Sequence, residues 1–342
     1  MKINVTLSLV FASSLILCSC FRNSEGGGSM LPNVAGSTGE VVVVIDKAKW
    51  DGALGEKIRE VFSSAVDGLP QSEPMFNITN VAPTAFGSIY MTHRNVIFID
   101  CGPDNTEPKA SFKTNTYANT QLMINLEGPD DNSVIKLLEK EKKSITDKIN
   151  IAERDRWISY YKRSINTPTF TNLKENHKML LYVPSNYKMD VNEKGFLWFS
   201  YETPMTTQAI LVHYFDYDGE NYFNEDSIKS IRNNMTRTRI KGSVDGTWMK
   251  IEDQIPVQYR TFRFRDRNYA ELKGLWTLEN GYMGGPFVCL VTKDEVNNRF
   301  VMVDGFVYAP HDNKRELLRQ LEAILYTVDF NTGSEEETKS QK

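Results

Sequence analysis

The segment Glu40–Asp46 (Glu-Val-Val-Val-Val-Ile-Asp) most constrains the fold, because its five central residues are all β-branched. β-branched side chains favour extended backbone, and a strand that is apolar on both sides has to be covered on both faces. The following segment, Glu56–Val66, places Ile58, Val61 and Phe62 on one face of a helix. A buried strand followed by an amphipathic helix predicts an α/β unit.

Apolar runs of strand length continue this pattern up to a long helix. The expected strands are Phe76–Val81, Phe86–Met91, Asn95–Cys101 and Gln121–Leu126, and the helix runs from about Ser133 to Tyr161. These elements predict an N-terminal α/β unit over residues 40–166. The polar segment Thr167–Glu175, which contains Pro168, is expected to be the boundary that follows it.

The second half alternates short apolar runs with turn residues. Its expected strands are Met179–Pro184, Gly195–Phe199, Thr207–Tyr214, Tyr222–Phe223, Thr247–Ile251, Val257–Arg267, Phe287–Val291 and Arg299–Tyr308. Asn224 is expected to cap a helix through about Arg239, and Asn313 with Glu316 forms a capping-box pattern before the last helix. We therefore predict a C-terminal α+β unit over residues 176–330 and a polar, disordered tail over residues 331–342.

The fold class predicted from these patterns is α+β or α/β. Two mixed-sheet units are expected, each with amphipathic helices packed on its sheet.

The first twenty residues have the anatomy of a bacterial lipoprotein signal. Lys2 supplies a basic start, Val5–Leu17 is apolar, and Leu17-Cys18-Ser19-Cys20 ends the run. The apolar stretch is too short for a membrane span, which needs about 20 residues. Leu-x-Ser-Cys resembles a lipobox, which predicts a signal peptide over residues 1–19 and lipidation of Cys20. Cys18 is the rival site, but the bulky Leu17 before it does not suit cleavage.

The segment after Cys20 is expected to tether the folded body to a membrane. Residues 20–39 are rich in glycine and serine and carry few apolar side chains. Several acyl chains on Cys20 would hold the protein stably, whereas one chain binds reversibly. The alternative is an ordinary disordered N-terminus after a cleaved signal, without lipid.

Composition and charge exclude some classes of partner. The chain of 342 residues has a formal net charge of −4, and a mildly acidic protein does not attract nucleic acid. Beyond Cys20, Cys101 and Cys289 are expected either to form one disulfide or to remain free thiols. Cys289 lies in the apolar run Pro286–Val291, which favours a buried free thiol as the alternative.

Catalytic and metal-binding motifs are missing from the sequence. It contains no nucleophile elbow, phosphate loop, dinucleotide fingerprint or His-Glu-x-x-His pattern. The four histidines, His93, His177, His213 and His311, have no ligand spacing. We therefore expect no catalytic residue, no cofactor and no metal, and enzyme activity is the minority interpretation.

Arg263, Arg265 and Arg267 are the strongest candidates for a binding site. Side chains alternate along a strand, so these three arginines are expected to share one face while Phe262 and Phe264 face the core. The functional interpretation is an anion site for an acidic envelope polymer or protein. The alternative is a solvated face that protects a sheet edge.

Several segments resemble domain-of-unknown-function family 4837, the uncharacterised envelope lipoproteins of Bacteroides-type bacteria. They are Gly39–Asp46 with Trp50, Gly68–Gln71, Glu73-Pro74, Phe76, Thr92–Asn95, Met283–Phe287, Asp304–Pro310 and Lys314-Arg315. The resemblance spans about Gly36 to Phe330. It implies a cell-envelope location but no substrate and no catalytic residue.

The resemblance has further implications for location and modification. With one acid in Phe21–Glu25, the lineage's signal for surface display is weak, which favours a periplasm-facing protein on either the inner or the outer membrane. Asp226-Ser227-Ile228 matches the short O-glycosylation pattern of this lineage at Ser227, although both polar residues also suit the first turn of a helix. The second half also resembles the α/β/α sandwich of Mog1-like and oxygen-evolving-protein-like domains, a likeness of fold.

The function expected from the sequence is that of a lipid-anchored cell-envelope protein, membrane-bound through Cys20 and acting as a non-enzymatic binding or scaffolding module. The alternative is an envelope hydrolase acting on cell-wall or glycan substrates. Its site would assemble only in the fold, around His93 or His213 and carboxylates.

Overall fold

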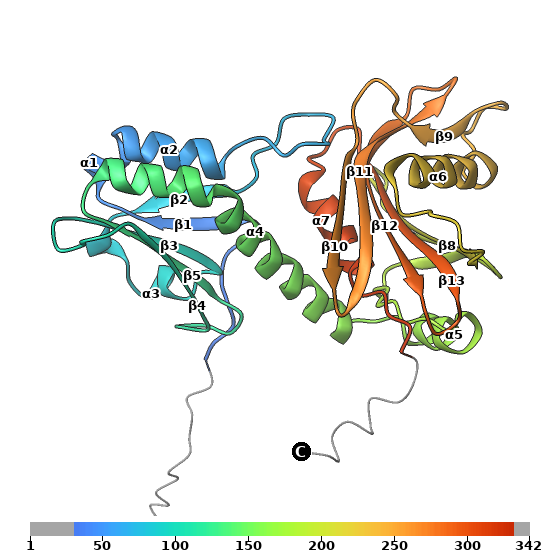
Figure 1. The fold of residues 1–342 in the computed structure, drawn as a ribbon, viewed down its shortest axis with the longest axis horizontal. Coiled ribbons are helices and arrows are strands. Elements are labelled where there is room, and N and C mark those ends of the chain that lie inside the picture. Colours follow the sequence, from blue (N-terminus) through green and yellow to red (C-terminus); the bar gives the residue numbers. More distant parts are fainter. Residues whose placement is uncertain (1–30, 332–342) are drawn as a thin grey trace, which may run out of the picture. The chain divides into compact units, whose positions relative to one another are not determined.

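The computed structural model describes residues 31–331, and Pro32 onwards belongs to one compact unit. This unit contains two β-sheets with helices packed against them (Figure 1). None of the helices within residues 31–331 is both long and apolar enough to cross a bilayer. Cys20, the signal peptide and residues 332–342 of the predicted tail lie outside the described residues.

The first sheet has five strands in the order β2-β1-β3-β5-β4. Its strands are β1 (Glu40–Val44), β2 (Asn77–Val81), β3 (Asn95–Cys101), β4 (Lys109–Thr114) and β5 (Leu122–Gly128). The central strands are parallel, with Val42 paired to both Thr79 and Val96, and β4 is antiparallel at one edge.

Both faces of this sheet are covered, which explains the uniformly apolar run in β1. Val41 and Val43 pack with helix α2 (Ala53–Phe62) and helix α4 (Asp131–Arg163). Val42 and Val44 pack on the other face with Phe86 and Tyr90. The remaining short elements of this region are α1 (Lys47–Trp50), η1 (Pro83–Ala85) and α3 (Ser88–Met91).

Helix α4 belongs to the cores of both sheets. Asp130 caps its first turn by accepting the N–H of Ser133 at 2.8 Å. Val134 and Leu138, near its start, pack against the first sheet. Ile158 and Tyr161, near its end, belong to the core of the second sheet. The predicted helix over residues 133–161 is therefore present and slightly longer than expected.

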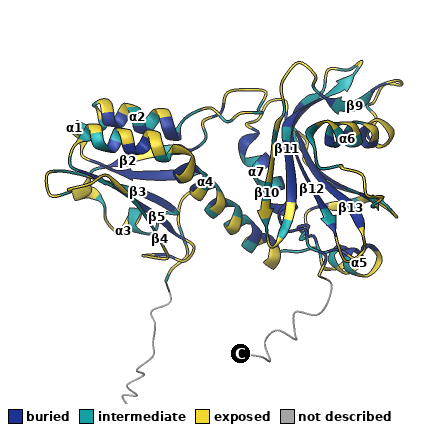
Figure 2. Ribbon diagram, in the orientation of Figure 1, coloured by how far each residue is buried: buried dark blue, intermediate teal, exposed yellow. Residues whose placement is uncertain are grey.

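The second sheet has eight strands, all antiparallel to their neighbours. Seven follow the order β10-β11-β12-β13-β8-β7-β6, and β9 pairs with β11 beyond the end of β10. They are β6 (Lys188–Glu193), β7 (Phe196–Glu202), β8 (Thr207–Asp216), β9 (Trp248–Ile251), β10 (Gln258–Phe264), β11 (Arg267–Glu279), β12 (Gly284–Asp294) and β13 (Arg299–Tyr308). Figure 2 shows that its central strands are buried along their length.

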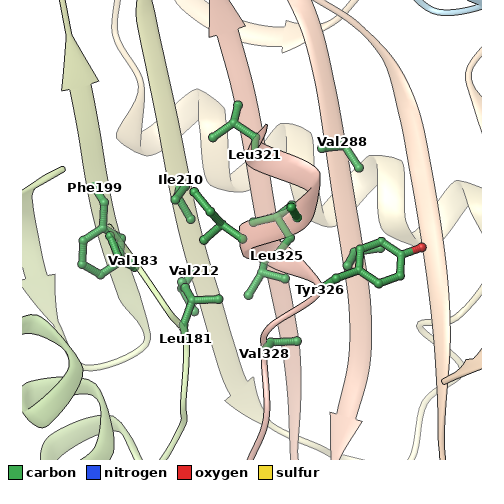
Figure 3. Packing of buried hydrophobic residues seen from close by; sticks show 14 of the residues in the cluster. Leu181, Val183, Phe199, Ile210, Val212, Val288, Leu321, Leu325, Tyr326 and Val328 are labelled. Carbon is green, nitrogen blue, oxygen red and sulfur yellow. The ribbon is translucent and has the colours of Figure 1, made fainter. Parts of the chain in front are cut away.

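Helices cover both faces of the second sheet. Helix α7 (Arg315–Leu325) lies on one face, where Leu321 and Leu325 pack towards Ile210, Val212 and Val288 (Figure 3). Gly305 on β13 allows this approach, since a Cβ there would lie 3.1 Å from the Cβ of Leu321. Helix α6 (Glu225–Arg239) lies on the opposite face, capped by Asn224 as predicted.

The predicted fold class is confirmed: helices pack on the two sheets, and the second sheet is the middle layer of an α/β/α sandwich. The prediction expected a mixed sheet in this half, whereas all the strand pairs of the second sheet are antiparallel.

Several predicted elements are wrong in detail. Phe86–Met91 contains helix α3 rather than a strand, and Thr167–Glu175 lies in helix α5 (Thr167–His177) rather than in a linker. Asn166 caps α5, and Pro168 sits in its first turn, where a missing N–H is tolerated. Met179–Pro184 forms isolated bridges only, and Tyr222–Phe223 is not a strand.

The predicted tether is shorter than residues 20–39. Asn33 and Ala35 form parallel bridges with Asn119 and His93, so the last part of the tether is attached to the first sheet region. Gly36 follows with φ +89° and lies directly against the imidazole of His93. A side chain at residue 36 would collide with that ring, which explains the glycine.

Candidate functional site

A cavity of about 540 Å³ lies between strand β10, helices α4 and α7, and the loop of residues 65–69. Helix α4 supplies Asp147, Asn150, Ile151, Arg154 and Trp157, which recur at helical spacing on one face. Ile151 is 44% exposed, so its apolar surface is accessible from the cavity side. The α4 wall therefore offers apolar and cationic groups side by side.

The α7 wall is positioned by a residue from the first sheet region. Glu73 is 3% exposed, and its carboxylate accepts the backbone N–H of Lys314 at 2.6 Å and that of Arg315 at 3.0 Å. A carboxylate at this position satisfies the free N–H groups of the first helical turn and suits the helix dipole. The predicted capping box of Asn313 and Glu316 is wrong, because α7 begins with Lys314 at its N-cap position and has no cap from its own first-turn side chains.

Two arginines of α7 reach back to the same segment. Arg315 donates to the carbonyl of Pro74, and Arg319 donates to the carbonyl of Met75 at 2.7 Å. Both guanidinium groups also bind the carboxylate of Glu316, at 2.8 and 2.9 Å. Their hydrogen bonds therefore hold the cavity wall together.

The cavity lining contains a network of paired charges. The Arg260 Nε donates to Glu271 at 2.7 Å, and the Tyr326 hydroxyl donates to the other oxygen of Glu271 at 2.9 Å. The Lys273 Nζ donates to Glu322 at 2.9 Å and lies 3.5 Å from Glu271. Each of these carboxylates thus has a cationic partner.

The network holds each group in one protonation state. Burial by itself would raise the pKa of Glu271, but the positive charges of Lys273 and Arg260 lower it below its usual value. Burial would lower the pKa of Lys273, but Glu322 and Glu271 raise it. Burial and the charge of Glu271 raise the pKa of Tyr326. At neutral pH the set therefore consists of a carboxylate, an ammonium and a neutral phenol.

Arg154 differs from the other cations of the cavity lining because its guanidinium forms no hydrogen bond with the described residues. Its centre lies 3.9 Å above the ring of Tyr326, and its nearest acid oxygen, on Glu322, is 3.9 Å from Nη1. The Nε atom is buried and has no partner among the described residues. The group is held by stacking and by the charge of Glu322, and its two Nη groups, rather than the buried Nε, are the donors available to a ligand.

The predicted arginine row is wrong as a strand face. Arg265 and Asp266 have φ values of 46° and 61°, so they form a two-residue turn between β10 and β11. Arg263 lies in β10, and its guanidinium is 3.5 Å from the carboxylate of Asp266. Arg267 begins β11, and its guanidinium pairs with the carboxylate of Asp329 at 2.8 Å. The turn interrupts the alternation on which the prediction depended. Anion binding by the three residues stays a prediction.

Cys101 and Cys289 do not form a disulfide. Both are free, with Cys101 at the end of β3 in the first sheet and Cys289 buried in β12 of the second. The Cys101 thiol donates to Asp131 at 3.0 Å, and burial raises its pKa to about 11. The buried free thiol considered for Cys289 is the state that the structure has.

None of the four histidines lines the cavity. His93 lies 3.4 Å from Glu40, and the His213 ring bonds to the carbonyl of Gly195 at 3.0 Å. Burial lowers the pKa of both. Within residues 31–331, no group of three acidic, histidine or cysteine side chains is arranged to hold a metal ion.

Ser227 lies in the first turn of α6, where its N–H binds Asn224 at 2.9 Å. Its O-glycosylation stays a prediction, as does lipidation of Cys20.

Arg154, Glu271 and Tyr326 were missed by sequence reasoning. Arg154 lies three residues before Trp157 and four before Ile158, which places its charge on the apolar face of the predicted helix. That charge on an apolar face is the sequence feature that could have marked it as a site residue. No sequence feature marked Glu271, since its pairing with Arg260 depends on the register of β10 against β11.

Comparisons with known proteins cover the two halves separately. Residues 166–327 match the family Domain of unknown function (DUF4837), and residues 34–162 match Domain of unknown function (DUF8532). The match to the first family therefore covers less than the span from Gly36 to Phe330. No curated protein matches the chain. Among solved structures, the Saccharomyces cerevisiae Ran-binding protein Mog1p is similar with 7% identity and a TM-score of 0.32, covering 46% of this chain and 92% of that one.

Proposed function

We propose, from the premise that residues 166–327 of this chain belong to the DUF4837 family, that the protein is a lipid-anchored envelope module that binds an anionic ligand without catalysis. The ligand site is the cavity between β10, α4 and α7. The observation that carries the proposal is Arg154, which lines a cavity of about 540 Å³ and whose guanidinium forms no hydrogen bond within residues 31–331.

The charges around Arg154 support an anion as the ligand. The lining carboxylates of Asp147, Glu153, Glu271 and Glu322 already lie in ion pairs, and Asp67 is an exposed carboxylate of the same lining. A guanidinium presents a fork of donors that matches carboxylate or phosphate. Arg154 is therefore the group in the lining that is best placed to pair with an incoming anion.

The same cavity favours binding over catalysis. General acid–base catalysis works best with a group whose pKa lies near the operating pH. The shifts at Glu271, Lys273 and Tyr326 all move away from neutrality. This contrast supports a binding module over the envelope hydrolase.

The anchor is part of the proposal and depends on the sequence Leu17-Cys18-Ser19-Cys20. A lipid on Cys20 would keep the cavity close to a membrane surface, where envelope polymers and proteins are concentrated. Docking and scaffolding require no turnover, in agreement with the charge-paired lining.

Binding is tested with two labelled polyanions, poly-L-glutamate and polygalacturonate, added to the full chain in detergent while fluorescence anisotropy is recorded. Arg154→Gln keeps a long polar side chain but removes the charge. The matched control is Lys140→Gln on the same helix, whose side chain is 79% exposed and lies outside the cavity lining. We expect Arg154→Gln to weaken binding about tenfold or more, and Lys140→Gln to leave it unchanged.

Binding of at least one polyanion should also weaken as salt rises. The proposal is wrong if neither polyanion binds, or if Arg154→Gln binds as the wild type does. It is also wrong if a polymer is cleaved and Glu271→Gln abolishes the cleavage. Equal melting temperatures of the two variants would exclude unfolding as the cause of lost binding.

A further inference from the structure

Strand β10 ends the second sheet and has a free outer edge. It pairs with β11 along all seven residues, from Gln258 with Lys273 to Phe264 with Arg267. No other described strand pairs with it (Figure 1). An unpaired edge is a template for another extended chain, and surface charges such as Arg260 and Arg263 limit pairing with unsuitable partners.

The turn determines which backbone groups of β10 point outwards. In a hairpin closed by two residues, the flanking residues Phe264 and Arg267 form a hydrogen-bonded pair. Hydrogen-bonded and non-bonded pairs then alternate along the ladder. The N–H and C=O groups of Tyr259, Thr261 and Arg263 therefore point away from β11, towards the free edge.

The cavity follows this edge. Arg260, Phe262 and Phe264, which alternate with the outward-pointing residues, line it, and so do Tyr259 and Arg263 from the opposite face of the strand. A hollow lined from both faces of one strand reaches around its edge. The exposed Ile151 and the unbonded Arg154 lie across from it on α4.

We propose that the anionic ligand is an extended polypeptide segment with acidic side chains, which adds to the free edge of β10 as a further strand. This inference rests on the proposed function and names its ligand class. The outward N–H and C=O groups would bind the peptide backbone. Alternate side chains of the segment would contact Arg154 and the apolar surface of Ile151 and Phe264, as in other strand additions.

The peptide is favoured over an acidic glycan by the outward N–H and C=O groups. They recur at every second residue, about 6–7 Å apart, which is the repeat of an extended peptide. A carboxylate on such a peptide matches the cation Arg154, whose Nη groups form no hydrogen bond with the described residues. A polysaccharide would use the arginine but not the regular series of backbone groups.

The test uses a capped hexapeptide of alternating glutamate and valine, and a copy whose alternate backbone nitrogens are methylated. The two probes have the same charge, but the second lacks the backbone donors of one edge. We expect the methylated copy to bind the full chain at least tenfold more weakly, because several hydrogen bonds are lost together. Equal binding of the two probes would contradict strand addition.

Thr261→Pro removes an outward N–H from β10, and Thr261→Ala is its matched control. Thr261 is exposed, and proline is tolerated on an edge strand where its missing N–H would face outwards. We expect Thr261→Pro to weaken hexapeptide binding about fivefold or more at an unchanged melting temperature, and Thr261→Ala to bind as the wild type does.

The polyanions separate failure of this inference from failure of the proposed function. If polygalacturonate binds through Arg154 while the hexapeptide does not bind, the ligand is an acidic glycan and strand addition is wrong, although the anion site stands. If neither binds, both proposals fail. Hexapeptide binding that is insensitive to Thr261→Pro would also overturn the inference.

Discussion

Glu73 caps a helix that begins more than two hundred residues later, through a hydrogen bond of 3.0 Å from the backbone N–H of Arg315. The carboxylate also binds the N–H of Lys314 and is 3% exposed. The start of α7 thereby depends on the segment that precedes β2.

Removing this cap should destabilise the protein. Glu73→Ala leaves two N–H groups without their acceptors, and we expect a loss of about 2 kcal/mol in the free energy of unfolding. Glu73→Gln keeps one acceptor oxygen and should lose less. Urea denaturation followed by circular dichroism measures both. Equal losses for the two variants would show that the charge, rather than the acceptor, carries the effect.

Removing one partner of the buried ion pair between Arg232 and Asp304 should destabilise the protein strongly, whereas replacing both with apolar residues should destabilise it much less. The two side chains are fully buried and bonded at 2.6 Å. Arg232→Met leaves a carboxylate alone in the core, which should cost about 3–5 kcal/mol. The double variant Arg232→Met/Asp304→Leu should lose much less, because no unpaired charge is left. Chemical denaturation of Arg232→Met, Asp304→Leu and the double variant gives the comparison, and additive losses would contradict it.

A better turn sequence should stabilise the hairpin of β10 and β11. Arg265 and Asp266 both have positive φ, a conformation that costs most residues about 1–2 kcal/mol. Asn-Gly is the preferred pair for a two-residue turn of this kind. Arg265→Asn/Asp266→Gly should therefore raise the free energy of unfolding by about 1 kcal/mol. A lower melting temperature in differential scanning calorimetry would refute this.

Stability should fall as the pH drops below about 6.5, partly through His177. Burial lowers the pKa of this imidazole, which bonds to Tyr214 at 2.8 Å and Asn192 at 2.7 Å. Its pKa is lower in the folded than in the unfolded chain, so the unfolded chain binds the proton first. Acid therefore stabilises the unfolded chain relative to the folded one. His177→Gln should reduce the slope of stability against pH below 6.5, by at most about 1.4 kcal/mol per pH unit. Denaturation at pH 5 to 8 measures the slope, and an unchanged slope would contradict the assignment.

Cys20→Ala should release the protein from membranes. Without the acceptor cysteine no lipid can be attached, so we expect the variant to move from the detergent phase to the aqueous phase on Triton X-114 separation. Cys18→Ala serves as the matched control and should stay in the detergent phase. Retention of the Cys20 variant with membranes would show that another feature anchors the chain.

The sequence by itself determined the elements whose patterns are local. The β-branched run in β1, the Asn224 cap of α6 and the stripe of α4 are each read from neighbouring residues, because strand and helix periods bring those residues onto one face. The fold class follows from such elements.

Only the tertiary structure decided the contacts between distant segments. Three residues illustrate this. Arg265 has a positive φ and turns a predicted strand into a hairpin. Glu73 binds the backbone of Arg315, and Glu271 binds the hydroxyl of Tyr326, both far along the chain. No local pattern marks a carboxylate that will cap a helix hundreds of residues away or enter an ion network through strand register. The cavity and its unbonded Arg154 exist because packing brought α4, α7 and β10 together, and packing depends on the whole chain.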